Sequence, residues 1–143
     1  MFKAVVVDSD AIFAIYNPND SLNKAATKTF QQLIAGDFEL IYPTSVIFEV
    51  ISLFQRVLPN QEVTAKLVEM IRNDEMLTFV IDQDILKQSA LIFDPTGSRK
   101  NTLVDCSVTA VAKKIKAEGV FAYDDFYRKQ GLKLARELFK PAN

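Results

Sequence analysis

The sequence predicts an α/β fold: a three-layer α/β/α sandwich with a central, mostly parallel sheet of four to five strands. Two observations favour this fold class. Apolar runs of strand length alternate along the chain with segments whose apolar residues recur at helical spacing. The first run starts at Ala4 without polar alternation, which is typical of a strand buried on both faces of a parallel sheet. This alternation of strand and helix implies helices on both faces of the sheet.

The other elements are predicted from the same patterns. The clearest helix is expected at residues 45–58, because Val46 and Val50 belong to an apolar stripe at helical spacing. Gly119 is expected to end a helix at residues 102–118. Further strands are expected at residues 38–42, 77–81, 120–123 and 132–134, and further helices at about residues 11–16, 21–35, 63–72, 85–93 and 126–130.

Composition narrows the class of protein. The 143 residues fit one domain, residues 1–143, and 49% of them are hydrophobic, which excludes a disordered or fibrous protein. No apolar run approaches the roughly 18 residues of a membrane span. The single cysteine cannot form an internal disulfide, so we expect a cytoplasmic protein with no membrane partner.

Charge and histidine content narrow the chemistry. The 17 Lys and Arg residues nearly balance the 18 Asp and Glu residues, which argues against holding nucleic acid through bulk positive charge. The chain has no histidine, which excludes histidine-based acid–base catalysis and histidine-ligated zinc. If the protein is an enzyme, carboxylates are the expected catalytic groups.

Acidic side chains stand where two predicted strands end and near where two predicted helices start. Because ligands of parallel sheets bind outside the carboxyl ends of the strands, these positions can share one edge of the sheet. Carboxylates gathered there raise each other's cost of ionisation, and a divalent cation relieves that repulsion. The acids are Asp8 and Asp10 after the first strand, Glu49 and Asp105 near the starts of helices, and Asp124 and Asp125 after the strand at residues 120–123.

Each acid also has a purely structural interpretation. Asp8 or Asp10 could cap the helix that comes after the first strand. Glu49 could be an exposed acid that is favoured near a helix N-terminus. Thr102 and Asp105 have the spacing of a capping box, and one acid of the doublet at residues 124–125 could cap the next helix.

Four segments carry these acids in a recognisable order over nearly the whole chain. They read Val-Val-Val-Asp8-Ser9-Asp10, Pro43-Thr44-Ser45-Val-Ile-Phe-Glu49, Thr102-Leu-Val-Asp105-Cys-Ser and Val-Phe-Ala-Tyr-Asp124-Asp125-Phe. Together they resemble the PIN domain family, specifically the small single-domain ribonucleases of the VapC toxin type.

The resemblance implies a metal-dependent ribonuclease, in which Mg²⁺ or Mn²⁺ assists the hydrolysis of RNA phosphodiester bonds. It also implies a homodimer and, for a toxin, a small antitoxin protein that covers the site. The four metal-binding acids of the family carry over to Asp8, Glu49, Asp105 and Asp124.

Other positions are less regular matches. Ser9 matches the small hydroxyl residue of the family after its first Asp, and Asp10 is an additional acid that would support the ligands. The family usually has Thr or Ser two residues before its last Asp, where this chain has Ala122. The doublet leaves Asp125 as the alternate ligand. RNA contacts are expected from Arg99, Lys100, Arg128 and Lys129, whose structural interpretation is solvated surface charge.

Two alternatives stay open. Asp8 and Asp10 after an apolar strand, with Thr44 after the second strand, are also similar to haloacid-dehalogenase-type phosphatases, in which Asp8 would be the nucleophile. The chain is short for that family and lacks its glycine after the acid pair. The other alternative is a catalytically silent PIN-like interaction module. Loss of core acids would indicate such a module, and here all four positions are filled.

Overall fold

The structure is a computed structural model that describes residues 2–139. At its centre lies a four-stranded sheet in the order β3-β2-β1-β4, and each neighbouring pair is parallel. This confirms the predicted α/β fold with a parallel sheet. The strands are β1 (Ala4–Val7), β2 (Glu39–Pro43), β3 (Leu77–Phe79) and β4 (Gly119–Phe121).

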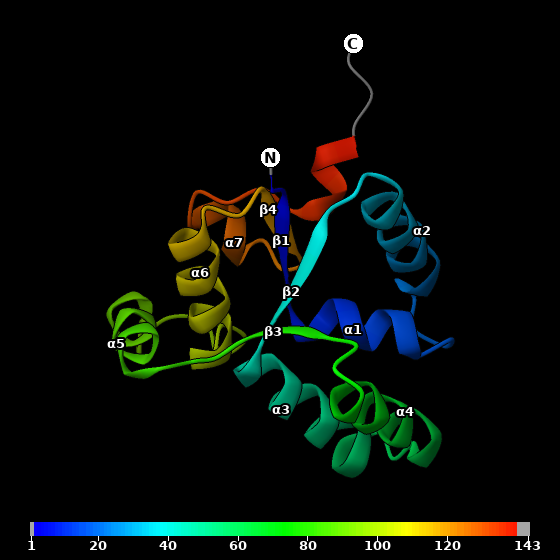
Figure 1. Ribbon diagram of the computed structural model, residues 1–143. Coiled ribbons are helices and arrows are strands. Elements are labelled where there is room, and N and C mark those ends of the chain that lie inside the picture. The colour runs from blue at the N-terminus through cyan, green and yellow to red at the C-terminus, as the bar shows by residue number, and fades with distance from the viewer. Residues whose placement is uncertain (1, 140–143) are drawn as a thin grey trace.

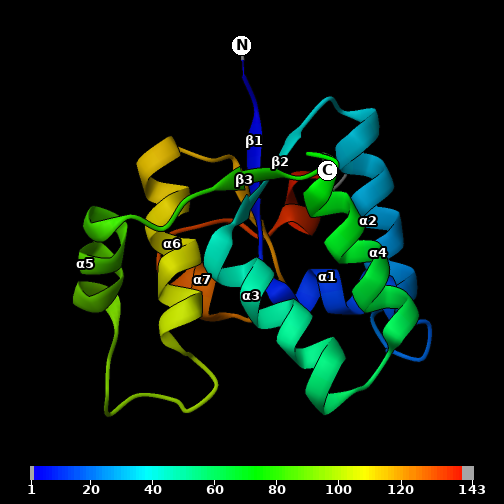
Figure 2. The ribbon, with the colours of Figure 1, turned by 60° about the horizontal axis from the view of Figure 1, so that its bottom comes forward.

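Helices cover both faces of the sheet (Figure 1). On one side lie α6 (Leu103–Ile115), α7 (Phe126–Lys129) and, outside α6, α5 (Gln83–Ile92). On the other side lie α1 (Ser9–Tyr16) and α2 (Asn23–Ala35). The helices α3 (Thr44–Ser52) and α4 (Gln61–Arg72) lie beyond the end of the sheet toward which β1 runs, and Figure 2 shows α3 between α6 and α1 at that end.

Strand β1 is buried on both faces, as its sequence predicts. Val5 and Val6 have no exposed surface, and Val7 is 1% exposed. Burying each valine stabilises the fold by about 1.5–3 kcal/mol. Because β1 pairs with β2 on one side and β4 on the other, its carboxyl end lies in the middle of the sheet edge. The next side chain, Asp8, is therefore delivered to a central position.

The end of α6 differs from the prediction. Gly119 does not end this helix; Lys116 does, in the left-handed conformation with φ 54° and ψ 49°. Gly119 instead begins β4, where a Cβ atom would lie 2.9 Å from the backbone oxygen of Lys133. The glycine is needed because two backbone segments meet there. The strand predicted at residues 132–134 is reduced to one bridge, between Val120 and Leu134.

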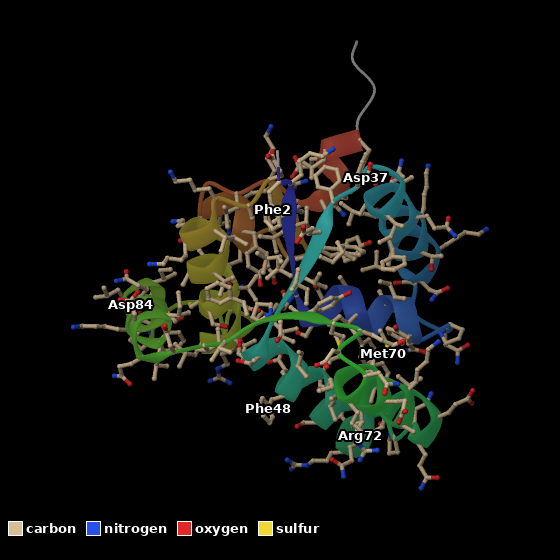
Figure 3. The ribbon with its side chains drawn as sticks, viewed as in Figure 1. Phe2, Asp37, Phe48, Met70, Arg72 and Asp84 are labelled. Atoms are coloured by element: carbon tan, nitrogen blue, oxygen red, sulfur yellow. The ribbon has the colours of Figure 1, made fainter. Side chains whose placement is uncertain are left out.

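The helix predicted at residues 45–58 is interrupted. After α3 the chain forms a π-helical turn, Leu53–Val57. The apolar stripe continues through this turn, because Phe54 is buried and stacks on Phe13 with ring centroids 5.0 Å apart. Phe48 lies outside the stripe: it is 76% exposed and points away from the sheet (Figure 3).

Among the described residues, no helix combines the length and apolar character needed to cross a bilayer.

Candidate active site: an acidic edge of the sheet

Asp8 lies at the junction of β1 and α1. Its backbone N–H donates to the carbonyl oxygen of Phe121 at 3.0 Å, which extends the pairing of β1 with β4 by one residue. Its carboxylate Oδ1 accepts a hydrogen bond from the Ser9 N–H at 2.7 Å and caps α1. The residue is only 3% exposed. Asp8 therefore caps α1, as one of its interpretations predicts. A capping role does not require the side chain to be buried, and the second carboxylate oxygen, Oδ2, does not contact the start of α1.

Glu49 reaches Asp8 through Ser9. The Ser9 hydroxyl lies 3.4 Å from Asp8 Oδ1 and donates a short hydrogen bond to Glu49 Oε1. Glu49 belongs to α3, which begins directly after β2 and is fastened to α6 by a 2.7 Å hydrogen bond between the hydroxyls of Ser45 and Ser107. The predicted serine thus lies between two of the predicted acids.

Asp105 lies in the first turn of α6, where it both caps the helix and faces the other acids. One oxygen, Oδ2, accepts a hydrogen bond from the Thr102 backbone N–H at 2.9 Å, as in a capping box. The other oxygen, Oδ1, lies 3.4 Å from the hydroxyl of Tyr127. The cap therefore orients the side chain and leaves one oxygen directed at the site.

The two acids of the doublet after β4 diverge. Asp124 Oδ1 accepts hydrogen bonds from the Phe126 N–H at 2.8 Å and from the Asn101 side chain at 3.4 Å. Asp125 forms an ion pair with Arg128 at 3.1 Å, and its side chain is 60% exposed. Asp124 is therefore the member of the doublet that lies among the other acids, and its charge acts on Asp10 and Asp105.

Asp10 lies in the same cluster. Its Oδ2 accepts a hydrogen bond from the Tyr123 backbone N–H at 2.9 Å, which ties α1 to the end of β4. Its Oδ1 is buried, and no donor among the described residues reaches it. We refer to Asp8, Asp10, Glu49, Asp105 and Asp124 as the acidic edge.

The acidic edge is electrostatically strained. Burial raises the pKa of Asp8 well above its usual value, and the charges of Asp10 and Asp105 raise it further. Burial is also the main cause that raises the pKa of Asp10 to about 6, with contributions from Asp105 and Asp124. The pKa of Asp105 rises to about 6 through burial and the charges of Glu49 and Asp124. Perturbed carboxylates gathered in this way are typical of functional sites.

Tyr127 contacts the acidic edge and was not among the residues predicted from the sequence. Its side chain has no exposed surface, and its hydroxyl donates a 2.6 Å hydrogen bond to Asp8 Oδ2. Burial and the charges of Asp8 and Asp105 raise the pKa of Tyr127 well above its usual value, so it stays protonated and acts as a donor. No local pattern in the sequence indicates these contacts, because Asp8 and Asp105 lie 119 and 22 positions away from Tyr127.

The four predicted RNA contacts are exposed, but one of them is engaged. Arg99 and Lys100 lie in the loop between α5 and α6, and Lys129 lies at the end of α7. Arg128 pairs with Asp125 and also with Glu137, at 2.9 Å. Its guanidinium is therefore held by intramolecular partners.

The acidic edge is not a formed metal centre in this arrangement. Within residues 2–139, no three or more Asp, Glu or Cys side chains are placed to hold one ion together. Hydroxyl hydrogens of Ser9 and Tyr127 occupy positions between the carboxylates instead.

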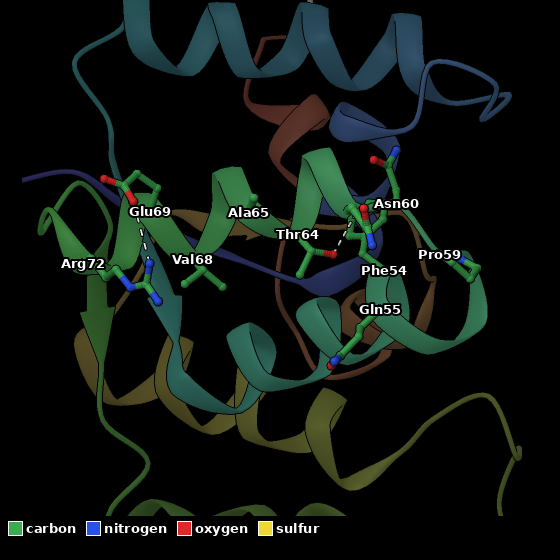
Figure 4. Close-up of a pocket in the computed structure, with 10 residues that line it drawn as sticks. Phe54, Gln55, Pro59, Asn60, Thr64, Ala65, Val68, Glu69 and Arg72 are labelled. Atoms are coloured by element: carbon green, nitrogen blue, oxygen red, sulfur yellow. Dashed lines mark hydrogen bonds and ion pairs between the residues drawn. The ribbon is translucent and has the colours of Figure 1, made fainter.

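A separate pocket of about 550 Å³ lies between the π-helical turn and α4 (Figure 4). Phe54, Pro59, Val68 and Arg72 are among its lining residues, and none of the lining residues belongs to the acidic edge. Arg72 is paired with Glu69 at 4.0 Å, and both side chains lie at this pocket.

A parallel sheet with acids gathered at the carboxyl edge defines an α/β domain built around an acidic site. The sequence matches the PIN domain family over residues 5–132, and the chain belongs to that family. A comparison with curated protein sequences finds no match.

Among solved structures, the fold is similar to that of VapC20 from Mycobacterium tuberculosis, a toxin described as cleaving the sarcin-ricin loop. The TM-score is 0.76, and the match covers 90% of this chain and 96% of VapC20. The two sequences are 18% identical, so the likeness establishes a shared fold.

Proposed function

We propose that this PIN domain is a metal-dependent ribonuclease that hydrolyses RNA phosphodiester bonds at the acidic edge. The observation that carries the proposal is the gathering of five carboxylates from four distant segments, three of them with raised pKa values. Charges of like sign destabilise the fold when they are buried together, so a structural role alone does not account for them.

The donor set fits Mg²⁺ or Mn²⁺. It consists of carboxylate and hydroxyl oxygens, which such hard cations prefer, and the chain has no histidine. The buried Oδ1 of Asp10 has no hydrogen-bond donor within residues 2–139, which is expected of an acceptor next to a cation site. Within residues 2–139 the acids are not arranged around one point, so some of their side chains would have to turn to bind the ion together.

The residues then have distinct roles. Asp8 and Asp105, each oriented by a helix-capping hydrogen bond, would hold the cation. Glu49 and Asp124 would complete the site or orient the attacking water, and Asp10 would support them. A bound divalent cation lowers the pKa of its water and stabilises charge on the phosphate and the leaving oxygen.

Substrate contacts would come from exposed cations that flank two of the acidic segments in sequence. Within the described part of the chain, Arg99, Lys100 and Lys129 form no ion pair, whereas Arg128 is held by Asp125 and Glu137. With a net charge of −1, the protein would bind RNA weakly through charge alone. A nuclease of this kind suits a structured RNA recognised by its shape.

The likeness to VapC20 supports a biological setting for this activity. We propose that the protein acts as the toxin of a toxin–antitoxin pair, forms a homodimer and is inhibited by a small antitoxin protein. The RNA target of VapC20 is not part of this proposal, because the two sequences are only 18% identical. Because the chain belongs to the PIN family, the haloacid-dehalogenase-type alternative is dropped. The catalytically silent interaction module stays as the alternative to a nuclease.

An RNA cleavage assay separates the nuclease from the silent module. Wild type should cleave structured RNA with Mg²⁺ or Mn²⁺ and lose cleavage in EDTA. Asp8→Asn and Asp105→Asn should each lower the rate by at least about 100-fold, because a bound cation supplies several kcal/mol of transition-state stabilisation. Asparagine keeps the cap on α1, so Asp8→Asn changes the charge and leaves the helix start intact.

The matched control is Asp125→Asn, which makes the same change at the neighbour of Asp124, an acid that lies outside the acidic edge. It should cleave at the wild-type rate. Equal cleavage by wild type, Asp8→Asn and Asp105→Asn would contradict the proposed site.

A further inference from the structure

The hydroxyl of Tyr127 is a donor at the acidic edge that comes from a distant part of the chain. It lies 119 residues from Asp8 in sequence and 2.6 Å from Asp8 Oδ2 in the structure. The same hydroxyl lies 3.4 Å from Asp105 Oδ1. A hydroxyl has one hydrogen, and the shorter distance assigns that hydrogen to Asp8. Tyr127 therefore stands between the two acids that are proposed to hold the cation.

The contact completes the hold on the Asp8 carboxylate. The backbone N–H of Ser9 holds Oδ1 at 2.7 Å, and this is a local contact made by the start of α1. Tyr127 holds the other oxygen, Oδ2, and belongs to α7, on the other side of the sheet from α1 (Figure 1). A carboxylate with both oxygens held cannot turn about its terminal torsion, which is otherwise soft. Each oxygen keeps a lone pair for a cation.

The position of Tyr127 is itself well determined. Its backbone carbonyl accepts hydrogen bonds from the Leu132 N–H at 3.0 Å and the Gln130 N–H at 3.1 Å. Its ring packs edge-on against Phe126, with centroids 5.4 Å apart. The Asp124 side chain accepts from the Phe126 N–H at the start of the same turn. A buried ring on a fixed backbone delivers its hydroxyl to one point.

We propose that Tyr127 is a positioning residue of the cation site: its hydroxyl holds Asp8 facing Asp105, and it keeps that contact when the cation binds. The inference rests on the proposed function, because it assumes that these acids bind a divalent cation. Hydrogen-bonding partners that orient metal ligands typically change metal affinity by about 10–100-fold when they are removed.

The test is Tyr127→Phe, which keeps the ring and removes one oxygen. Binding of Mn²⁺ alone is measured by isothermal titration calorimetry on the full chain, with circular dichroism to check the fold. We expect the dissociation constant for Mn²⁺ to rise by about tenfold. The control is Tyr16→Phe, whose hydroxyl contacts the Met70 sulfur at 3.5 Å, away from the acids, and which should bind Mn²⁺ like wild type.

Two outcomes of this titration are distinguishable. If wild type binds Mn²⁺ and a folded Tyr127→Phe binds it equally or more tightly, Tyr127 does not position the ligand and the inference fails alone. If wild type binds no Mn²⁺, the proposed function fails and takes the inference with it.

A second measurement uses wild type and does not depend on the folding of that variant. The chain has four tyrosines, so labelling tyrosine Cζ with ¹³C gives four signals, which Phe variants at positions 16, 42 and 123 assign by elimination. Adding diamagnetic Mg²⁺ should shift the Tyr127 signal and leave that of Tyr16 in place. A Tyr127 signal that stays fixed while calorimetry records binding would overturn the inference.

Discussion

Two neighbouring strands, β1 and β4, are each followed by two acids, yet the side chains of the two pairs have different partners. After β1, both Asp8 and Asp10 turn toward the acidic edge, and their pKa values are raised. After β4, Asp124 turns toward it, whereas Asp125 turns outward to Arg128. The two pairs also stand differently relative to the next helix. Asp8 precedes α1 and Asp10 lies within it, whereas both acids after β4 precede Phe126, the first residue of α7.

The contrast shows how the start of a helix affects which partners the nearby acids contact. At β1 the first acid caps α1 and the second lies in its first turn, where it accepts a hydrogen bond from the Tyr123 backbone N–H. At β4 neither acid lies within a helix, and each takes the partner that its own direction allows. Similar pairs of acids therefore give two members of the acidic edge in one place and one in the other. Three predictions test this comparison.

The largest effect is expected from the two acids of the β4 doublet. Asp124→Asn should lower RNA cleavage by about 100-fold, because it removes a proposed ligand or water-orienting group. Asp125→Asn should change cleavage by less than about twofold, because Asp125 lies outside the acidic edge. The loss of its surface ion pair should not unfold the protein, since such pairs contribute at most about 1 kcal/mol to stability. Rates are measured with saturating Mn²⁺. An equal loss of cleavage rate in both variants would contradict the different roles given to Asp124 and Asp125.

The next effect concerns stability and pH at the β1 pair. Because burial and the charges of Asp105 and Asp124 raise the pKa of Asp10 to about 6, the folded protein binds this proton more tightly than the unfolded chain does. Metal-free stability should therefore fall as the pH rises from about 4 to about 6 and stay lowered above that range. Asp10→Asn should remove this loss and raise the free energy of unfolding at pH 7.5 by about 3 kcal/mol.

Urea unfolding in EDTA at pH 4 and pH 7.5 measures this effect. At pH 4 the variant and wild type should differ by less than about 1 kcal/mol, because Asp10 is protonated in the folded protein and about half protonated in the unfolded chain. Asp125→Asn is the control and should show no comparable gain at pH 7.5. A variant at Asp10 that is no more stable than wild type at pH 7.5 would argue that this carboxylate is not strained.

The smallest effect is expected from the partner of Asp125. Arg128→Ala breaks exposed ion pairs with Asp125 and Glu137, so it should lower the free energy of unfolding by at most about 1 kcal/mol. The loss should shrink further in 1 M salt, which screens exposed charges. Thermal unfolding at two salt concentrations measures it. A salt-independent loss well above this size would place Arg128 among the buried interactions that shape the acidic edge.

Much of the fold was predictable because its signals are local. Val5 and Val6 belong to an uninterrupted apolar run, and such a run has few solutions other than a strand buried on both faces. Lys116 was not recognisable as the end of α6, since it is a lysine in a conformation that glycine usually adopts. Gly119, the residue expected there, has a different role in the fold: it lets β4 approach the backbone of Lys133.

The candidate site was predictable as a set of positions and less so as a set of contacts. Asp8 and Asp105 were expected either to cap helices or to face the site, and the structure shows that one oxygen can do the first while the other does the second. Asp124 was the ligand expected from the resemblance, with Asp125 as the alternate, and the contacts that separate the two could not be read from the sequence. Their directions depend on where α7 begins and on the position of Arg128.

The sequence by itself determined that acids stand at strand ends and helix starts, because burial and helical period are properties of neighbouring residues. Only the tertiary structure decided that Tyr127 meets Asp8, that Ser9 meets Glu49 and that Asp125 turns away. Those contacts join residues up to 119 positions apart, and their geometry depends on how the helices pack at the carboxyl edge of the sheet. The physical reason is that a pattern along the chain specifies which face a residue takes, while packing specifies which residue it meets there.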